Sequence, residues 1–374
     1  MSSISSQPRP YDIAAYYWPA YHDEPRWRRF MPEGDGEWEI MRKARSKFEG
    51  HRQPRVPVWG YANESDPRVM EQKIDAAADH GVNVFIFDWY WYDDQPFLED
   101  ALERGFLQAR NRDRMRFYLM WANHDATTLW DLEQSHERKV IWPGTVDRPT
   151  FDRIGSRWIE LYFGHPCYYR IDGKPVVSIY ELGPFIEGLA GIEAAKEALD
   201  DLRAKAAAAG FPGLHIQAIL WDKMPETLSM VPGDRTQTRD ATIRFLGIDG
   251  LTNYQWCHYV RPRGDYQVWG ETAIAAWEKW AEEFSAPFYP HVSIGWDSNP
   301  RVAAPREIIT DETPELFGGF LRQALDFVDS RGLSPRLVTV NSWNEWSEGS
   351  YLEPDTVHGM GYLEAVKREL ARAR

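Results

Sequence analysis

The chain has 374 residues, carries a formal net charge of −14, and is 43% hydrophobic. This length and composition predict a folded protein with a sizeable core and exclude a disordered chain. Because the balance is acidic and the basic residues form no long run, nucleic acid is excluded as a partner.

Apolar runs alternate with segments of helical periodicity along most of the chain. The apolar runs predict strands at 12–18, 82–88, 116–121, 175–180, 214–220, 246–251, 288–294 and from 338 onward. Periodic apolar residues predict helices at 67–80, 96–110, near 152–163, 193–209, 272–284, 314–330 and 362–374. The helix at 67–80 has the clearest boundaries, with Pro67 at its start and Gly81 after its end.

Eight strands, nearly all separated by helices, predict a parallel (β/α)8 TIM barrel with long loops after the strands. An open, doubly wound sheet is the alternative, but no glycine-rich fingerprint follows an early strand. No internal repeat or linker interrupts the pattern, so we expect one barrel domain over residues 1–374.

In a parallel barrel, the residues that follow each strand meet at one face, where active sites form. We therefore expect a cleft lined by the polar residues at the strand exits: Asp88, Asn123, His124, Glu181, Asp222, Asn253, Asp297, Glu345 and Glu348. Aromatic and amide neighbours complete the candidate substrate-binding set: Tyr17, Trp18, Trp89, Tyr90, Tyr254, Trp296, Trp343, Asn344 and Trp346.

The aromatic content is high, with 18 Trp, 18 Tyr and 17 Phe residues, many of them beside Asp, Asn, His or Glu. Such neighbourhoods suit sugars, because C–H groups pack on rings while hydroxyls meet carboxylates and amides. The alternative is interior packing, and we expect about two-thirds of these rings in the core.

Glu345 and Glu348 are the strongest catalytic candidates. Their backbones lie about 5 Å apart in a turn, or up to roughly 10 Å apart if extended, which covers the carboxyl separations that cleave glycosidic bonds. A carboxyl kept protonated by its surroundings can act as an acid while the other stays ionised. Trp343 and Trp346 would supply apolar surroundings, and Asn344 a hydrogen bond to a sugar hydroxyl. Alternatively, both glutamates cap the following loop or lie in solvent.

The other candidates also have structural interpretations. Asp297, near Arg301, either binds substrate hydroxyls or forms an Asx turn. His124 either orients substrate or packs in its loop. Asp88 and Glu181 either bind sugar or serve as a loop anchor and an ion-pair partner, respectively.

The sequence lacks the motifs of several other kinds of functional site. No His-x-His or His-Glu-x-x-His pattern supports a metal site, and neither Gly-x-Ser-x-Gly nor a phosphate-binding loop is present. We therefore expect no metal and no cofactor. Cys167 and Cys257 are expected to be free thiols. The chain shows no leader pattern and no run of about eighteen apolar residues, so we expect a cytoplasmic protein without a membrane span.

The segment from Asn341 to Gly349 reads NSWNEWSEG and runs on to Leu352-Glu353-Pro354. It resembles the signature of the glycoside hydrolase family 99-like proteins, which include endo-α-mannosidases and WbsX-type proteins of polysaccharide biosynthesis. Four further segments are similar to the WbsX branch in the same order: AYYW at 15–18, FDWY at 87–90, WANHD at 121–125 and GWDSNPR at 295–301.

This resemblance implies a (β/α)8 barrel and a retaining mechanism assisted by the substrate. Glu345 would deprotonate the sugar 2-hydroxyl, which attacks the anomeric carbon to give a 1,2-anhydro sugar. Glu348 would protonate the leaving oxygen and then activate water. The mannosidases usually have His between the two glutamates, where this chain has Ser347, so the preference for mannose does not carry over.

Three functions stay open at this point. The first is a glycoside hydrolase acting on an α-linked oligosaccharide or polysaccharide. The second is a WbsX-type glycosyltransferase, which would need a diphosphate site, and Asp93-Asp94 is the one faint candidate for it. The third is a non-catalytic carbohydrate-binding barrel. The acidic balance and the missing phosphate loop favour hydrolysis.

Overall fold

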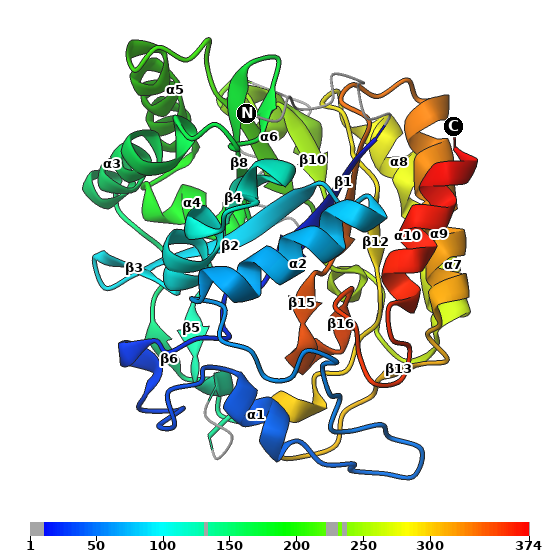
Figure 1. Ribbon diagram of the computed structural model, residues 1–374. Coiled ribbons are helices and arrows are strands. Elements are labelled where there is room, and N and C mark those ends of the chain that lie inside the picture. Colours follow the sequence, from blue (N-terminus) through cyan, green and yellow to red (C-terminus); the bar gives the residue numbers. More distant parts are fainter. Residues whose placement is uncertain (1–10, 131–133, 222–230, 234–237, 374) are drawn as a thin grey trace.

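The computed structural model describes residues 11–130, 134–221, 231–233 and 238–373. At its centre, eight parallel strands lie in the spatial order β10–β9–β8–β4–β2–β1–β14–β12 (Figure 1). These strands are β1 (Asp12–Tyr17), β2 (Val84–Tyr92), β4 (Arg116–Trp121), β8 (Lys174–Ile179), β9 (His215–Ile219), β10 (Gly250–Thr252), β12 (His291–Ser293) and β14 (Leu337–Asn341). β1 lies between β2 and β14, with Ala14 opposite Val84 and Thr339.

Backbone hydrogen bonds around Leu251 close this sheet into a barrel. The Leu251 amide donates to the Pro287 carbonyl at 2.9 Å, and the Tyr289 amide donates to the Leu251 carbonyl at 2.8 Å. β10 therefore pairs with the residues that lead into β12, and the strands follow one another around the barrel in chain order. The predicted (β/α)8 barrel is confirmed, and the stretch from 338 supplies its last strand.

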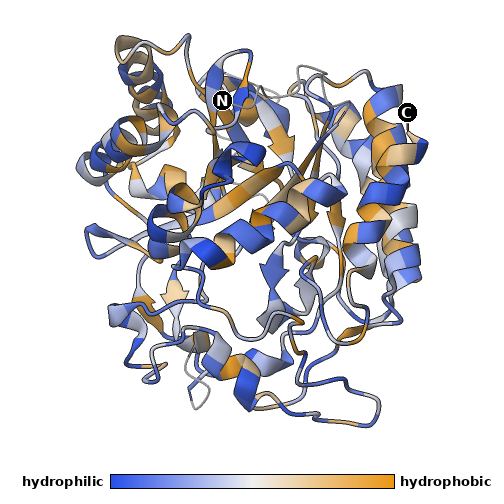
Figure 2. Ribbon diagram, viewed as in Figure 1, coloured by the Kyte–Doolittle hydropathy of each residue, from blue (hydrophilic) through white to orange (hydrophobic). Residues whose placement is uncertain are grey.

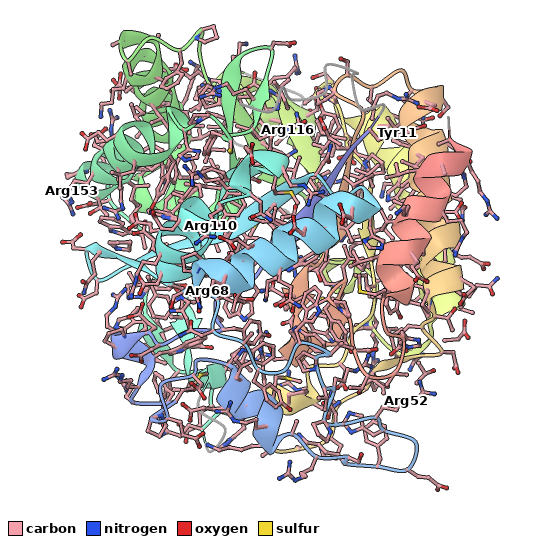
Figure 3. The ribbon with its side chains drawn as sticks, viewed as in Figure 1. Tyr11, Arg52, Arg68, Arg110, Arg116 and Arg153 are labelled. Carbon is pink, nitrogen blue, oxygen red and sulfur yellow. The ribbon has the colours of Figure 1, made fainter. Side chains whose placement is uncertain are left out.

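Helices cover the outside of the barrel (Figure 1). They are α2 (Pro67–His80), α3 (Arg148–Arg157), α4 (Leu182–Gly188), α5 (Ile192–Ala208), α6 (Arg239–Leu246), α7 (Tyr266–Ile274), α8 (Ala276–Glu283), α9 (Pro314–Ser330) and α10 (Gly361–Arg372). Figure 2 shows hydrophobic strands in the centre and hydrophilic outer faces on helices such as α2. The exposed side chains of Arg68, Arg110 and Arg153 lie in this outer layer (Figure 3).

Helix α2 shows how sequence signals set an element's bounds. The Asp66 side chain accepts a hydrogen bond from the Arg68 amide at 2.9 Å, which caps the first turn, and Pro67 occupies the first helical position. Gly81 ends the helix in the left-handed conformation, with φ of 95°. The bounds Pro67–His80 match the prediction, as do Pro314–Ser330 for α9 and Arg116–Trp121 for β4.

The predicted helix at 96–110 is shorter than predicted and is not an α-helix. β2 continues to Tyr92, beyond the predicted end at residue 88, and pairs with the antiparallel strand β3 (Gln95–Phe97) through a turn at Asp93-Asp94. Both turn residues have positive φ, as short hairpin turns require. A π-helical turn (Ala101–Gly105) and a 3-10 turn (Phe106–Gln108) follow. A Cβ on Gly105 would lie 2.1 Å from the Glu64 carbonyl oxygen, so a side chain there cannot fit.

Other predicted boundaries shift. The predicted helix at 272–284 is two helices, α7 and α8, and the one near 152–163 is α3 followed by a π-helical segment (Trp158–Phe163). The predicted strand at 246–251 begins only at Gly250, because Leu246 is the last residue of α6 and Gly247 ends that helix with φ of 66°. The remaining predicted strands and helices agree with the structure to within three residues.

The loops after the strands carry short elements of their own. They are α1 (Trp38–Lys43), the antiparallel pair β5 (Ala126–Thr127) and β6 (Val140–Trp142), the parallel pair β11 (Gly264–Asp265) and β13 (Ile309–Thr310), and the hairpin β15 (Asn344–Glu345) and β16 (Ser350–Tyr351). Most of them lie at the lower end of the barrel in Figure 1. The helices of the described residues include none with both the length and the apolar composition of a membrane span. Both cysteines are free, as predicted.

Candidate active site

A cavity of about 290 Å³ lies at the carboxyl ends of the barrel strands. Nine of the predicted site residues line it: Trp18, Asp88, Tyr90, His124, Glu181, Tyr254, Trp296, Glu345 and Glu348. They come from loops and strand ends that are far apart in sequence, so the cavity is a product of barrel closure.

Glu345 and Glu348 lie at the two ends of one tight turn. Glu345 ends β15 and precedes a 3-10 turn (Trp346–Glu348), and Gly349 follows in the left-handed conformation. Both carboxyls line the cavity, so the turn presents them to the same side. The Ser342 hydroxyl accepts from the Glu345 amide at 2.7 Å and donates to the Ser350 carbonyl at 2.6 Å, which fixes the turn.

Arg301 joins these two glutamates to a third, Glu37. Its Nη1 donates to Glu348 Oε1 at 2.5 Å, its Nη2 lies 3.6 Å from Glu345 Oε1, and its Nε donates to Glu37 Oε1 at 2.9 Å. Glu37 Oε2 also accepts from Trp18 Nε1 at 2.8 Å and from the Ser347 hydroxyl at 2.6 Å. One buried guanidinium therefore serves three carboxyls, and Glu37 has the most donors.

Glu345 has further donors of its own. Its Oε2 lies 3.0 Å from the Tyr254 hydroxyl and accepts from Asn341 Nδ2 at 3.2 Å. The same Tyr254 hydroxyl lies 2.8 Å from Asp88 Oδ2. Asp88, Tyr254 and Glu345 thus form a buried row of three polar groups along the cavity wall.

The two turn glutamates hold protons unequally. Burial, reinforced by the charge of Glu345, raises the pKa of Glu348 well above the ordinary glutamate value, although Arg301 opposes this. Burial also raises the pKa of Glu345, but Arg301, Tyr254 and Asn341 all stabilise its anion. Glu348 is therefore the carboxyl that keeps a proton to higher pH, and Glu345 ionises first.

Aromatic rings form much of the remaining wall. Trp221 and His258 stack with ring centres 3.7 Å apart, and Tyr180 packs edge-on against Trp221 and Tyr254. Burial lowers the pKa of His258 to about 3, so this imidazole is neutral at physiological pH. Burial likewise lowers the pKa of His124.

Three predicted site residues from the final motif support the cavity from behind. Asn344 Oδ1 accepts from the Trp18 amide and its Nδ2 donates to the Trp18 carbonyl, both at 2.8 Å, which holds Trp18 in place. Trp346 donates to Glu353 at 2.7 Å and stacks on Tyr351. Trp343 is buried against Phe85.

The other predicted residues that the structure describes also lie outside the cavity lining. Tyr17 packs on Phe87, and Trp89 donates to Glu99 at 2.7 Å. Asn123 and Asn253 bond to the backbone at the neighbouring strand ends. Asp222 falls outside the described residues.

Asp297 organises a loop. Its carboxylate accepts from Asn299 and Gln53 and lies 2.9 Å from His51 Nε2. Although burial opposes ionisation, these hydrogen bonds hold the pKa of Asp297 below its ordinary value. The Asx-turn interpretation therefore describes its contacts, and the turn delivers Arg301 to the cavity.

Sequence reasoning missed several residues of this site. Glu37 lies in a stretch without clear periodicity, and no local signal marks it. Arg301 stood out only as a neighbour of Asp297, and Tyr180, Trp221 and His258 were not selected, although Tyr180 and Trp221 stand at strand exits. Among the described residues, no three His, Cys, Asp or Glu side chains are grouped to hold a metal ion.

Comparison with known proteins identifies relatives of the whole barrel. Residues 13–366 match the family described as Glycosyltransferase WbsX. The uncharacterized protein WxcX of Xanthomonas campestris pv. campestris is 26% identical over 372 residues, which cover 97% of this chain and 50% of WxcX. The chain thus spans about half the length of the curated relatives it matches.

Solved structures share the fold. The GH99 endo-alpha-mannosidase from Bacteroides thetaiotaomicron superposes with a TM-score of 0.59 at 14% identity, covering 97% of each chain. A glycoside hydrolase-like protein superposes with a TM-score of 0.62 at 16% identity, covering 99% of this chain and 96% of that one. At these identities the similarity establishes the fold alone. Because the family match runs from the first barrel strand into the last helix, the chain belongs to the WbsX family.

Proposed function

We propose that this chain is a carbohydrate-active enzyme, specifically a glycoside hydrolase that cleaves an α-linked oligosaccharide or polysaccharide with retention. The observation that carries the proposal is the turn bearing Glu345, which is buried, and Glu348, which is partly buried: two carboxyls of unequal pKa that face an aromatic-lined cavity. An acid and a base side by side are what cleavage of a glycosidic bond requires.

The first step uses the substrate's own 2-hydroxyl as nucleophile. Glu345, as carboxylate, removes the proton of that hydroxyl, and its oxygen attacks the anomeric carbon to form a 1,2-anhydro sugar. The bond from the anomeric carbon to the leaving oxygen breaks, and Glu348 donates its proton to that oxygen. The step needs Glu345 ionised and Glu348 protonated, and the contacts of Arg301, Tyr254 and Asn341 that stabilise the Glu345 anion support this assignment.

The second step restores both groups. Glu348, now a carboxylate, removes a proton from water, whose oxygen attacks the anomeric carbon. The three-membered ring opens, and the 2-oxygen takes back the proton held by Glu345. Two inversions at the anomeric carbon give net retention.

The cavity lining supports a sugar substrate. Trp18, Tyr90, Tyr180 and Trp296 offer ring faces or edges, while Glu181 offers a carboxylate whose pKa is raised by burial and by Asp125. Rings and carboxylates together match the apolar faces and hydroxyl edges of a sugar. Ser347 stands where the mannosidases usually have His, so the proposal names no particular sugar.

A glycosyltransferase is the second candidate, and the family description favours it. Asp93 and Asp94, the acidic pair considered for a diphosphate site, form the turn between β2 and β3, and Asp94 pairs with Arg153 at 2.5 Å. Neither lines the cavity with Glu345 and Glu348.

The test of hydrolysis is E348Q assayed on oligosaccharides with poor and with activated leaving groups. Loss of the acid should slow the poor substrate by about 10²–10⁴-fold and the activated one much less, because its leaving group needs no proton. E364Q, on the exposed side of α10, is the matched control. Unchanged hydrolysis of the poor substrate by E348Q would exclude the acid role.

Two further measurements separate the alternatives. Proton NMR of the first-formed product should show the anomeric configuration of the substrate, and inversion would rule out this mechanism. A thermal-shift series compares oligosaccharides with nucleotide sugars. Stabilisation by nucleotide sugars only would favour the transferase, and binding of oligosaccharides without turnover would favour a carbohydrate-binding barrel.

A further inference from the structure

The row Asp88–Tyr254–Glu345 contains one hydroxyl between two carboxyls. Tyr254 Oη lies 2.8 Å from Asp88 Oδ2 and 3.0 Å from Glu345 Oε2, both hydrogen-bond distances. A phenol has one proton, so it donates to one of these oxygens only. The other contact is a hydrogen bond only if that carboxyl is itself protonated and donates to Tyr254 Oη.

The surroundings decide which carboxyl carries the additional proton. Glu345 has other stabilising neighbours, with Asn341 Nδ2 at 3.2 Å and the Arg301 guanidinium at 3.6 Å. Asp88 is 2% exposed, and Tyr254 is the one described residue that hydrogen-bonds its carboxyl. Its second oxygen, Oδ1, is buried without a partner among the described residues. An anion is favoured where donors converge and opposed where a buried oxygen lacks one.

We infer that Asp88 is a neutral carboxylic acid that donates its proton to Tyr254 Oη, while Tyr254 donates to Glu345 and holds it as the anionic base. Asp88 is thereby a positioning residue that acts on Glu345 through Tyr254. The protonation state of Asp88 stands on the geometry alone, whereas its effect on catalysis rests on the proposed hydrolase function.

Groups on every neighbouring element agree with this arrangement. Tyr16 on β1 and Tyr90 on β2 surround Asp88 without bonding it, and Arg301, after β12, contacts Glu37, Glu345 and Glu348 instead. Burial, followed by the charge of Glu345, raises the pKa of Asp88 well above its ordinary value. With Asp88 and Glu348 both protonated, Glu345 is the ionised member of the row and of the turn in the free enzyme.

Infrared spectroscopy of the substrate-free protein tests the protonation state. We expect a carboxylic-acid C=O band at neutral pH that shifts when aspartate alone is labelled with ¹³C, and that is absent from D88N. The labelling needs no variant, so a folding defect cannot produce the result. If no aspartic-acid band is present at neutral pH, Asp88 is ionised and the inference is overturned, whatever the enzyme's activity.

The activities of three variants, D88N, D88A and Y254F, test the effect on Glu345. An amide at position 88 is neutral and still donates to Tyr254, so D88N should stay at least about tenfold more active than D88A, the difference expected when a buried hydroxyl loses its only second partner. Y254F removes the donor to Glu345, and the acidic limb of its activity profile should move to higher pH. If D88N is instead as inactive as E345Q, Asp88 acts as an anion. If the wild type hydrolyses no glycan, the proposed function fails while the infrared result still stands.

Discussion

Two ion clusters lie on either side of the turn that follows β14, and one of the two opens to the cavity. The cavity cluster consists of Arg301 with Glu37, Glu345 and Glu348. The sealed cluster consists of Lys73 with Glu64 and Glu353, where Lys73 Nζ lies 2.5 Å from each carboxylate and all three side chains are at most 3% exposed. The sealed cluster also accepts hydrogen bonds from Asn344 and Trp346, the residues on either side of Glu345.

The difference lies in what each carboxyl is bonded to. In the sealed cluster every carboxyl binds Lys73 and a residue of the final motif, so the cluster fixes the backbone around Glu345. In the cavity cluster the Arg301 guanidinium contacts three carboxyls. One positive charge does not balance three negative charges, so one carboxyl retains a proton. The sealed cluster thus supports the geometry of the turn, and the cavity cluster supplies its dissociable proton.

Replacing Arg301 by Met should have the largest effect. It leaves two buried carboxyls and the partly buried Glu348 without a cation, so we expect a loss of about 3–5 kcal/mol in unfolding free energy. Hydrolysis should nearly vanish, because the pKa of Glu345 rises and the base is no longer ionised. Urea unfolding and a pH–activity profile measure both effects. R261M, which removes an exposed pair with Glu307, should cost less than about 1 kcal/mol. A stable, active R301M would show that the cavity cluster does not depend on this cation.

Replacing Lys73 by Met should destabilise the fold by a similar amount, about 3–5 kcal/mol, because two buried carboxylates lose their partner. Activity per folded molecule should fall less than in R301M, since Lys73 does not line the cavity. The triple variant K73M/E64Q/E353Q should recover most of the stability, because the amide oxygens still accept from Asn344 and Trp346. If the triple variant is no more stable than K73M, the loss does not come from unpaired charge.

The barrel could be predicted because most of its strands and helices are marked by residues within or next to the element itself. The helix at 67–80 has a cap, a proline and a terminal glycine, and the strand at 116–121 is a short apolar run, so neither depends on distant residues. The region 96–110 misled because its apolar spacing resembles a helix. Pairing of Tyr90 with Phe97 keeps the start of this region in a strand, and the helical turns that follow, from Ala101 to Gln108, are π and 3-10 in type.

The candidate site was predictable at the strand exits and not elsewhere. Glu345 and Glu348 follow a barrel strand, so their place near the cavity follows from topology. Glu37 lies 264 positions from Arg301 in the chain, and only the closed barrel brings them within 2.9 Å. Asp297 follows a strand but does not line the cavity. Position after a strand does not reveal whether a side chain points to the cavity or to its own loop.

The pH dependence of the unfolding free energy should show whether Glu348 holds its proton above the ordinary glutamate pKa. Its folded pKa is raised, so its stabilising contribution is complete below the ordinary value of 4.5 and is lost as pH rises through the folded pKa. E348Q cannot ionise and should gain stability relative to the wild type over that range, by up to about 1.4 kcal/mol per pH unit. Urea unfolding at several pH values measures the difference. Parallel curves would mean that Glu348 has an ordinary pKa.

The same comparison can be made in the sealed cluster. Burial, opposed by Lys73, raises the pKa of Glu64 to about 7. The unfolding free energy of E64Q relative to the wild type should therefore rise with pH until about 7 and then level off. A constant difference between E64Q and the wild type from pH 4.5 to 7 would contradict the raised pKa of Glu64.

Replacing Ser347 by Ala should have the smallest effect, because Glu37 keeps its contacts with Arg301 and Trp18. The hydroxyl donates to Glu37 at 2.6 Å, and losing one such bond to a charged group should cost about 1.5–3 kcal/mol of stability. W18F removes the neighbouring donor to the same oxygen, but it also alters a ring that lines the cavity. Ser347 does not line the cavity, so S347A should leave KM unchanged, whereas W18F should raise it. A raised KM in S347A would mean that this position, where the mannosidases usually have His, also reaches the substrate here.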